Sequence, residues 1–281
     1  MEAQESAGKK DGSQIKIAMR ILKDYAGEMV TLDQIDGDFC RGYITYLLTE
    51  YHPKGKDISN YTLHNYYRAL NGALNSAVRK KKMKANPFNE LEKSEKIRKP
   101  ESMRSYMTIE EVQALIDTPM PHEEYEIVKC AYLFSCFCGL RISDIIKLKW
   151  NDVFVDRGQY RLAVSMKKTK EPIYLPLSPE ALKWMPERGG KSSEDNVFDL
   201  PSANTIRMQL KPWAKAAGIS KRFSYHTSRH TFATMMLTLG ADLYTVSKLL
   251  GHADVKMTQV YAKIINKKKD EAVNLVNGLF H

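Results

Sequence analysis

Apolar residues recur at helical spacing in three segments of the first third of the chain, with polar residues between them. This pattern is typical of amphipathic helices that bury one face. We therefore predict a small helical bundle. Its apolar positions are Ile15, Ala18, Ile21, Leu22 and Tyr25, then Phe39, Tyr43, Ile44 and Leu47, then Leu63, Tyr67, Leu70, Leu74 and Ala77.

The third predicted helix runs into a basic string that contains Arg79, Lys80, Lys81, Lys82 and Lys84. Asn86-Pro87 is expected to stop that helix, because proline disfavours a helical conformation in the residue before it. The basic side chains either follow a DNA backbone or complement the negative end of the helix dipole. Phosphate contact is the interpretation that we favour.

A polar stretch from Glu90 to Ser105 has too few apolar residues to form a core element. A new helix is predicted after it, because Thr108 and Glu111 have the spacing of a capping box. We assign residues 1–97 to an N-terminal helical domain with a short polar tail, 98–107 to a linker and 108–281 to a second domain.

The second domain is predicted to mix helices with a few strands. A long apolar helix is expected from Tyr125 to Phe137, ended by Gly139. Between Val153 and Leu177 the apolar period changes to two, which indicates short antiparallel strands joined near Asp156 to Gln159 and near Thr169 to Pro172. Ser178-Pro179 then begins another helix, and the remainder to His281 is mostly helical. The predicted fold is mainly α with a small antiparallel β-sheet, the α+β class.

The charge composition of the chain indicates a polyanionic partner. The chain has 281 residues, with 43 Lys and Arg against 33 Asp and Glu, a formal net charge of +10. Such a balance suits a polyanion, nucleic acid first, although solvated lysine faces would give the same charge. No apolar run approaches the roughly 20 residues of a membrane-spanning helix. Met1 to Gln14 has no signal-peptide core, so we expect a cytoplasmic protein without membrane contact.

The four cysteines are Cys40, Cys130, Cys136 and Cys138. None forms the C-x-x-C pair of a zinc site, and we interpret them as reduced core residues. His226 and His230 do not fit an H-E-x-x-H metal site either, because Thr227 follows the first histidine. The sequence therefore predicts no metal.

Three clusters in the second domain combine cations or imidazoles with small and apolar residues. Arg141 lies in a turn within the segment 138–144, where it is suited to bind a phosphate or to pair with Asp144. His226 and Arg229 lie one helical turn apart in the segment 225–230. His252 belongs to the segment 250–253, which Tyr261 follows. Each cluster alone would more often be structural.

Together the clusters resemble the catalytic domain of tyrosine recombinases, the phage-integrase family. The resemblance covers roughly 105–270 and implies a helical, SAM-like core-binding domain before it. Two segments are similar to the family's best-preserved motifs: Gly139 to Asp144 and Leu249 to His252. The segments 244–252 and 261–264 are particularly similar to integrases of Bacteroidetes mobile elements. By this resemblance the catalytic residues are Arg141, Lys168, His226, Arg229, His252 and Tyr261.

The lysine is the least specific of these positions. The family usually has Lys-Thr-Gly in its strand hairpin, whereas this chain has Lys168-Thr169-Lys170. Lys168 is chosen because Thr169 follows it, and Lys167 is the alternative.

The resemblance implies site-specific recombination of double-stranded DNA through a 3′-phosphotyrosine on Tyr261. It implies no cofactor, neither metal nor ATP. It also implies a homotetramer on DNA, with accessory DNA-bending proteins as further candidate partners and a C-terminal tail helix that docks on a neighbouring subunit. One alternative is a type IB topoisomerase, but the length of the chain and the integrase-like motifs argue against it. The other is a non-catalytic DNA-binding regulator, which would tolerate phenylalanine at position 261.

Overall fold

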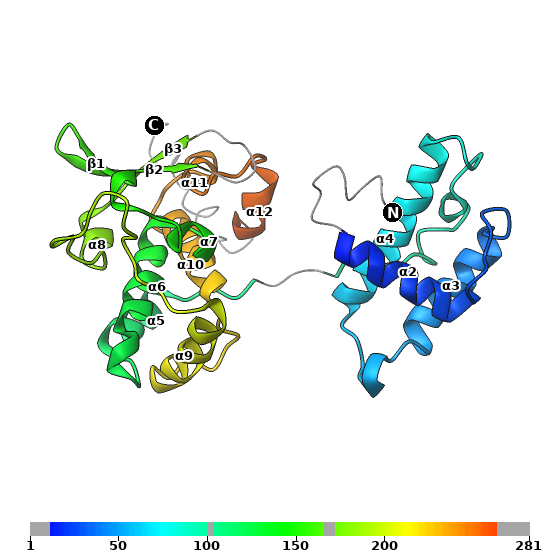
Figure 1. Cartoon of the computed structure of the whole chain (residues 1–281), viewed down its shortest axis with the longest axis horizontal. Helices are drawn as coiled ribbons and strands as arrows, with labels where there is room; N and C mark the ends of the chain where they lie inside the picture. The colour runs from blue at the N-terminus through cyan, green and yellow to red at the C-terminus, as the bar shows by residue number, and fades with distance from the viewer. Residues whose placement is uncertain (1–11, 101–103, 166–171, 263–281) are drawn as a thin grey trace, which may run out of the picture. The chain divides into compact units, whose positions relative to one another are not determined.

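Residues 12–100, 104–165 and 172–262 are described by a computed structural model, in which the chain divides into two units, Met1–Ser102 and Met103–His281 (Figure 1). Each unit has its own hydrophobic core. Among the described residues, no helix combines the length and the apolar content needed to cross a membrane.

The first unit contains the three predicted helices, α2 (Gly12–Ala26), α3 (Gly37–Thr49) and α4 (Asn60–Arg79). Asp36 and Ser59 cap α3 and α4, because their side chains accept hydrogen bonds from the amides of the first turn. The predicted apolar faces meet in the core, where Ile21, Tyr43 and Leu47 are almost fully buried. The helical bundle is therefore confirmed.

The end of α4 differs from the prediction. The helix ends at Arg79, before Asn86-Pro87, and Lys81 has a left-handed backbone with φ of 55°. Asn86 instead buries its side-chain amide, which donates to Asn71 Oδ1 at 2.7 Å and to Asn75 Oδ1 at 2.8 Å. The asparagine thus fastens the chain back onto α4 and precedes a 3₁₀ turn, Pro87–Asn89.

The prediction that the polar stretch from Glu90 to Ser105 contributes nothing to a core was wrong for its first part, which packs on the first unit. Leu91 is 3% exposed and belongs to its core, and Arg41 Nε donates to Glu95 Oε1 at 2.8 Å. At the other end of the stretch, the Met107 amide donates to Thr231 Oγ1, so this residue belongs to the second unit.

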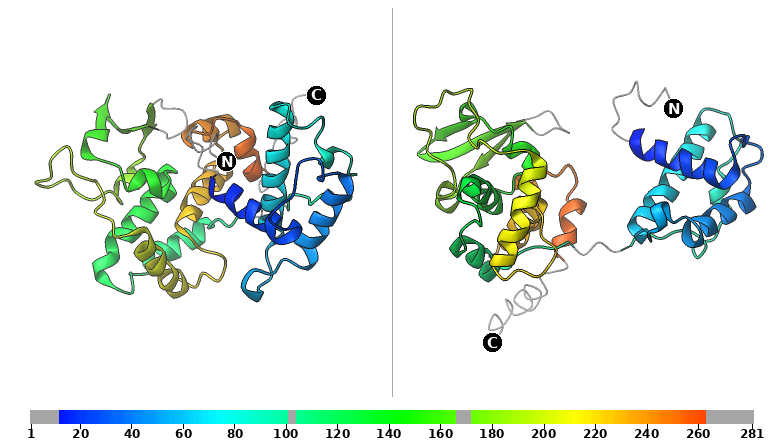
Figure 2. Two further views of the ribbon diagram at one scale, coloured as in Figure 1. Left: turned by 45° about the vertical axis from the view of Figure 1, so that its right-hand side comes forward. Right: turned by 60° about the horizontal axis from the view of Figure 1, so that its bottom comes forward.

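The second unit is built around α6 (Glu126–Cys138) and α10 (Tyr225–Thr238), which pack against each other (Figures 1 and 2). The phenol of Tyr225, at the start of α10, donates to Ala131 O of α6 at 2.6 Å. This bond fixes the beginning of α10, where the predicted site residues lie. The other helices are α5 (Ile109–Asp117), α7 (Ile142–Ile145), α8 (Pro179–Leu182), α9 (Ala203–Ala216), α11 (Leu243–Leu249) and α12 (Lys256–Ala262).

The predicted strands form one antiparallel sheet in the order β1 (Val153–Asp156), β2 (Gln159–Ser165) and β3 (Pro172–Pro176). Val153 pairs with Leu162, and Leu162 pairs with Leu175, so the alternating apolar residues share one face. Arg157 and Gly158 turn β1 into β2 with positive φ. The connection from β2 to β3 lies outside the described residues.

Local signals in the second unit are confirmed as well. Thr108 and Glu111 form the capping box of α5, and Ser178 caps α8. Gly139 ends α6 with φ of 73°. A Cβ added at Gly139 would lie 2.5 Å from Phe232 Cδ1, so both the backbone conformation and the space require glycine.

We predict that Gly139→Ala lowers the free energy of unfolding of the second unit more than Gly158→Ala does. Both glycines have positive φ, but a Cβ at Gly158 meets nothing within 4 Å. Gly158→Ala should cost about 1 kcal/mol from backbone strain, and Gly139→Ala about 1–3 kcal/mol more from overpacking. Urea unfolding followed by tryptophan fluorescence measures both variants.

Tryptophan reports on this unit alone, since Trp150, Trp184 and Trp213 all belong to it. Equal losses in the two alanine variants would contradict the steric role of Phe232.

Candidate active site

Arg229 connects the three clusters that the sequence singled out. Its guanidinium donates from Nη1 to Gly139 O at 2.7 Å and from Nη2 to Leu250 O at 2.5 Å. The side chain is 2% exposed. Burial lowers the pKa of Arg229 to about 10, and Arg141 is the next cause, so the group stays charged at neutral pH. The turn after α6, the helix α10 and the end of α11 are thereby held together.

Arg141 lies between α6 and α7 and reaches the surface, with a side chain that is 33% exposed. Its Nη1 lies 4.0 Å from Asp144 Oδ2, so the ion pair that the sequence suggested is present. The charge of Arg141 helps to lower the pKa of Arg229, so the two guanidiniums lie close enough to interact. Such a pair is suited to bind a phosphate.

Two predicted histidines flank these cations. Desolvation and then the positive charges of Arg229, Arg104 and Arg141 lower the pKa of His226. Desolvation and the same arginines lower the pKa of His252 to about 4. His252 Nδ1 lies 2.7 Å from Thr258 Oγ1, which orients the ring. Both imidazoles are therefore neutral at pH 7 and belong to the same electrostatic environment.

Tyr261, on α12, points into the unit and is 1% exposed. It packs with Phe232, Leu237, Val246 and Leu250 in a small core formed by α10, α11 and α12. Its phenolic oxygen lies 2.5 Å from His230 Nδ1 and accepts a hydrogen bond from Arg104 Nη1 at 3.3 Å. The phenol is thus hydrogen-bonded to His230 and Arg104, and it interacts electrostatically with Arg229, which the sequence did predict.

His230 and Arg104 were not among the predicted site residues. His230 is 8% exposed, and its ring lies 4.5 Å from that of His226, one turn earlier on α10. The spacing of these histidines was the signal that could have marked His230. Arg104 precedes α5 in a polar stretch with several other basic residues, so nothing in the sequence distinguishes it.

Lys168 and the alternative Lys167 lie outside the described residues, so the structure places neither. The structure also describes no set of three or more His, Cys, Asp or Glu that could hold a metal ion, within the residues it covers.

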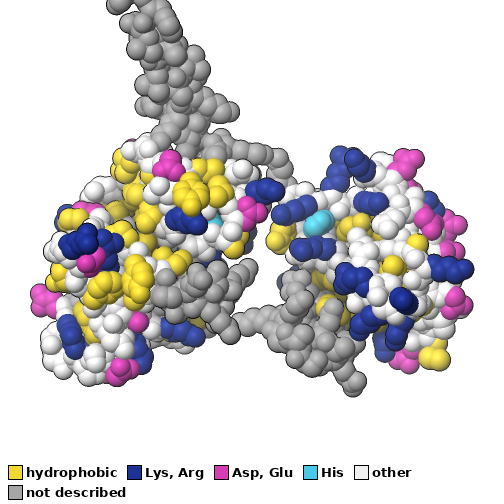
Figure 3. All heavy atoms as spheres, turned by 90° about the horizontal axis from the view of Figure 1, so that it is seen from above, with side chains coloured by type: hydrophobic (Ala, Val, Ile, Leu, Met, Phe, Trp, Pro, Cys, Tyr) yellow, Lys and Arg dark blue, Asp and Glu magenta, His cyan; other side chains and the backbone are white. Residues whose placement is uncertain are grey.

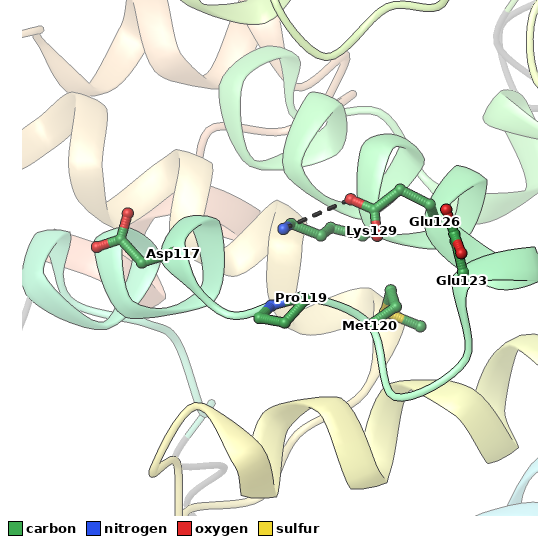
Figure 4. Close-up of a pocket in the computed structure, with 6 residues that line it drawn as sticks. All are labelled: Asp117, Pro119, Met120, Glu123, Glu126 and Lys129. Carbon is green, nitrogen blue, oxygen red and sulfur yellow. Dashed lines mark ion pairs between the residues drawn. The ribbon is translucent and has the colours of Figure 1, made fainter.

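A cavity of about 460 Å³ lies away from this site, between the end of α5 and the start of α6 (Figure 4). Its lining includes Asp117, Glu123 and Glu126, and the one lysine that lines it, Lys129, lies 3.5 Å from Glu126. Carboxylates repel phosphate, so this cavity is unsuited to a nucleic-acid backbone.

Two sequence families match the chain and together cover most of it. Residues 105–268 match the phage integrase family, and residues 1–99 match the phage integrase SAM-like domain.

Curated relatives are named tyrosine recombinases. One from Pseudothermotoga lettingae is 29% identical in an alignment of 242 positions, which covers 78% of this chain and 82% of that protein. Tyrosine recombinase XerD of Vibrio vulnificus is 32% identical in an alignment of 184 positions, which covers 60% of this chain and 59% of that protein. The match to XerD therefore spans less than two thirds of that relative.

Solved structures share the fold. The XerH site-specific recombinase, bound to a palindromic difH substrate in a post-cleavage complex, has a TM-score of 0.73 and 18% identity, over 93% of this chain and 78% of that one. The Tn1549 transposon integrase, in complex with a circular intermediate DNA, has a TM-score of 0.71 and 18% identity, over 92% of each chain.

We predict that Arg229→Lys lowers the free energy of unfolding of the second unit by about 2–3 kcal/mol, because an ammonium group cannot bridge the two carbonyls that the planar guanidinium joins. Urea unfolding followed by tryptophan fluorescence measures the loss. The matched control is Arg207→Lys on α9, where the exposed guanidinium bonds only locally to Asn204. It should change stability by less than about 0.5 kcal/mol. Equal effects of the two substitutions would contradict the bridging role.

We predict that the second unit loses stability as the pH falls from 7 to 4.5. Burial and the neighbouring cations lower the pKa of His230 from 6.5 to about 3 in the folded protein. The unfolded chain therefore binds a proton in this window while the folded chain does not, so the stabilisation is complete above pH 6.5 and is lost below it. The expected loss from His230 is about 2 kcal/mol at pH 4.5.

The variant His230→Asn cannot take up that proton, so its stability should fall less over the same window. Parallel stability curves for the two proteins, measured by urea unfolding at each pH, would contradict a buried neutral His230.

Proposed function

The chain belongs to the phage integrase family of tyrosine recombinases, which cut and rejoin DNA through a phosphotyrosine intermediate, and we propose that Tyr261 is its nucleophile. One observation supports the assignment: the buried phenol is hydrogen-bonded to His230 and Arg104 and interacts electrostatically with Arg229. The full set of catalytic residues proposed is Arg141, Lys168, His226, Arg229, His252 and Tyr261.

The cations account for the charge that develops during the reaction. Tyr261 attacks the scissile phosphate and becomes joined to its 3′ side, while the bond to the 5′ oxygen breaks. Negative charge grows on the nonbridging oxygens, and the guanidiniums of Arg141 and Arg229 stabilise it. His252 donates a hydrogen bond to one of these oxygens from its Nε2–H, since its Nδ1 faces Thr258. This clamp does the work that metal ions do at other phosphoryl-transfer sites.

Proton transfers complete the cycle. Lys168 gives a proton to the departing 5′ oxygen as general acid, and Lys167 is the alternative for this role. His226 assists proton transfer at the nucleophile. The 5′ hydroxyl of a partner strand then attacks the phosphotyrosine and releases Tyr261. Because each bond broken is replaced by one of similar energy, the reaction consumes neither ATP nor another cofactor.

The partner is double-stranded DNA that carries recombination sites. XerH and the Tn1549 integrase, which share this fold, were solved bound to DNA. We propose strand exchange within a homotetramer on DNA, with the tail helix of one subunit docked on its neighbour and with accessory DNA-bending proteins as further partners. The tail lies outside the described residues.

The first unit supplies further phosphate contacts in this proposal. Lysine and arginine side chains are frequent on its surface (Figure 3). The basic string that begins with the last residue of α4 is exposed at Arg79, Lys80, Lys81, Lys82 and Lys84. Exposed cations in such a run bind a DNA backbone without reading its sequence. The comparisons favour a recombinase over the topoisomerase alternative, since the relatives reported above are named recombinases.

We predict that the protein forms a covalent adduct with nicked DNA and that Tyr261→Phe abolishes it, because phenylalanine has no oxygen to attack phosphorus. A pool of nicked duplexes of randomised sequence is incubated with protein in EDTA, since the guanidinium clamp needs no added metal. Adducts are then separated on a denaturing protein gel. The nick lets the short cleaved strand diffuse away, which traps the intermediate.

Tyr261→Phe should retain noncovalent DNA binding in a gel-shift assay, which controls for folding. An adduct that persists in this variant, at wild-type yield, would refute the assignment of the nucleophile.

A further inference from the structure

We propose that His230 is the catalytic base that takes the proton of Tyr261 when the phenol attacks DNA. This inference rests on the proposed role of Tyr261 as nucleophile, and it assigns the direct proton acceptor to a residue outside the six named above. His226, which the sequence placed nearest to this task, is then the neighbour of the base.

Contact geometry is the first argument. His230 Nδ1 lies 2.5 Å from the phenolic oxygen of Tyr261, and the side chains are 8% and 1% exposed. A base must lie within hydrogen-bond reach of the proton that it removes. His226 lies beside His230, with ring centroids 4.5 Å apart, whereas the hydrogen bonds described for the phenol join it to His230 and Arg104.

The hydrogen-bond donors and acceptors around the phenol give the direction of this contact. A guanidinium only donates, so the bond from Arg104 Nη1 occupies a lone pair of the phenolic oxygen. The single phenolic proton is then free to point at His230 Nδ1. This nitrogen must be the unprotonated one, with the ring hydrogen on Nε2. Arg104 is thereby placed to stabilise the phenolate that develops.

The surroundings of His230 keep its ring unprotonated at neutral pH, so Nδ1 can accept a proton. Burial is the main cause that lowers the pKa of His230 to about 3, and the groups that face the ring add to it. These groups are His226 and Arg229 on α10, Arg104 before α5 and His252 after α11. The ring is therefore neutral at pH 7. This neutral nitrogen accepts the phenolic proton as the bond between the oxygen and phosphorus forms.

The step balances. The phenolic O–H bond breaks and its proton moves to His230 Nδ1, while the oxygen forms a bond to phosphorus. The bond from phosphorus to the 5′ oxygen breaks, and that oxygen takes the electron pair and a proton from Lys168. When the partner strand reverses the reaction, His230 returns its proton to the phenol. A bound phosphate also brings negative charge among the cations, which makes His230 a better base only while DNA is present.

The experiment separates activation of the nucleophile from protonation of the leaving group. A duplex that forms adducts with the wild type is taken from the randomised pool and is also made with sulfur in place of the 5′ bridging oxygen. A thiolate leaves without a proton, so this substrate needs no general acid. The variants are His230→Asn, which keeps an acceptor near the Nδ1 position but cannot bind a proton, and Lys168→Ala as the comparator.

On the ordinary duplex we expect His230→Asn to form adducts roughly 10² to 10³ times more slowly than the wild type, the range of one lost proton transfer. The sulfur substrate should rescue Lys168→Ala and leave His230→Asn slow. Tryptophan fluorescence and gel-shift binding verify that each variant is folded and binds the duplex.

Two outcomes would overturn the role of His230 while the proposed function stands. An adduct rate for His230→Asn within about threefold of the wild type would show that a hydrogen-bond acceptor suffices and that the residue only positions the phenol. Rescue of His230→Asn by the sulfur substrate would place its action on the leaving group. A wild type that forms no adduct with any duplex would instead overturn the proposed function, and His230 with it.

Discussion

The site depends on one buried guanidinium that is shared between two carbonyl groups. Arg229 bonds to Gly139 O, which is 90 residues away in the chain, and to Leu250 O, which is 21 residues away. Carbonyl dipoles, rather than a carboxylate, offset the cost of burying its charge. Among the described residues no carboxylate forms an ion pair with Arg229, so its positive charge stays available to an anion. Arg229 thus both joins two distant segments of the chain and supplies the buried positive charge of the site.

A second constraint follows from the first, because cations gather where the protein supplies few anions. Arg104, Arg141 and Arg229 all lower the pKa of His226 and His252. Both imidazoles are therefore neutral, so each has one ring nitrogen that donates a hydrogen bond and one that accepts. A phosphate that enters this region supplies the missing negative charge, so binding of DNA and tuning of the imidazoles are the same electrostatic event.

The proposed nucleophile, Tyr261, is held by parts of the chain with different positions in the fold. His230 belongs to the central helix α10, which Tyr225 fastens to α6, whereas Arg104 lies beside the division between the two units. The phenol therefore contacts helix α10 on one side and the residues just before α5 on the other.

The sequence by itself determined the elements whose signals are local. The capping box of α5, the glycine end of α6, the alternation in β1 and β2 and the apolar faces of α2, α3 and α4 each depend on residues a few positions apart. The resemblance also located the segments that carry Arg141, Arg229, His252 and Tyr261. The predicted end of α4 at Asn86-Pro87 was wrong. The helix ends at Arg79, and the chain then folds back so that the Asn86 amide bonds to Asn71 and Asn75.

Only the tertiary structure decided which side chains touch the phenol. Arg104 and Tyr261 are separated by 157 residues and His230 and Tyr261 by 31, distances over which neither helical period nor capping carries information. Burial of Tyr261 against α10 and α11 likewise arises from packing of whole helices. The sequence identified the residue types of the site, whereas the packing of the helices determined which side chains contact each other. The reason is that these hydrogen bonds join residues that are close in space but distant in the chain.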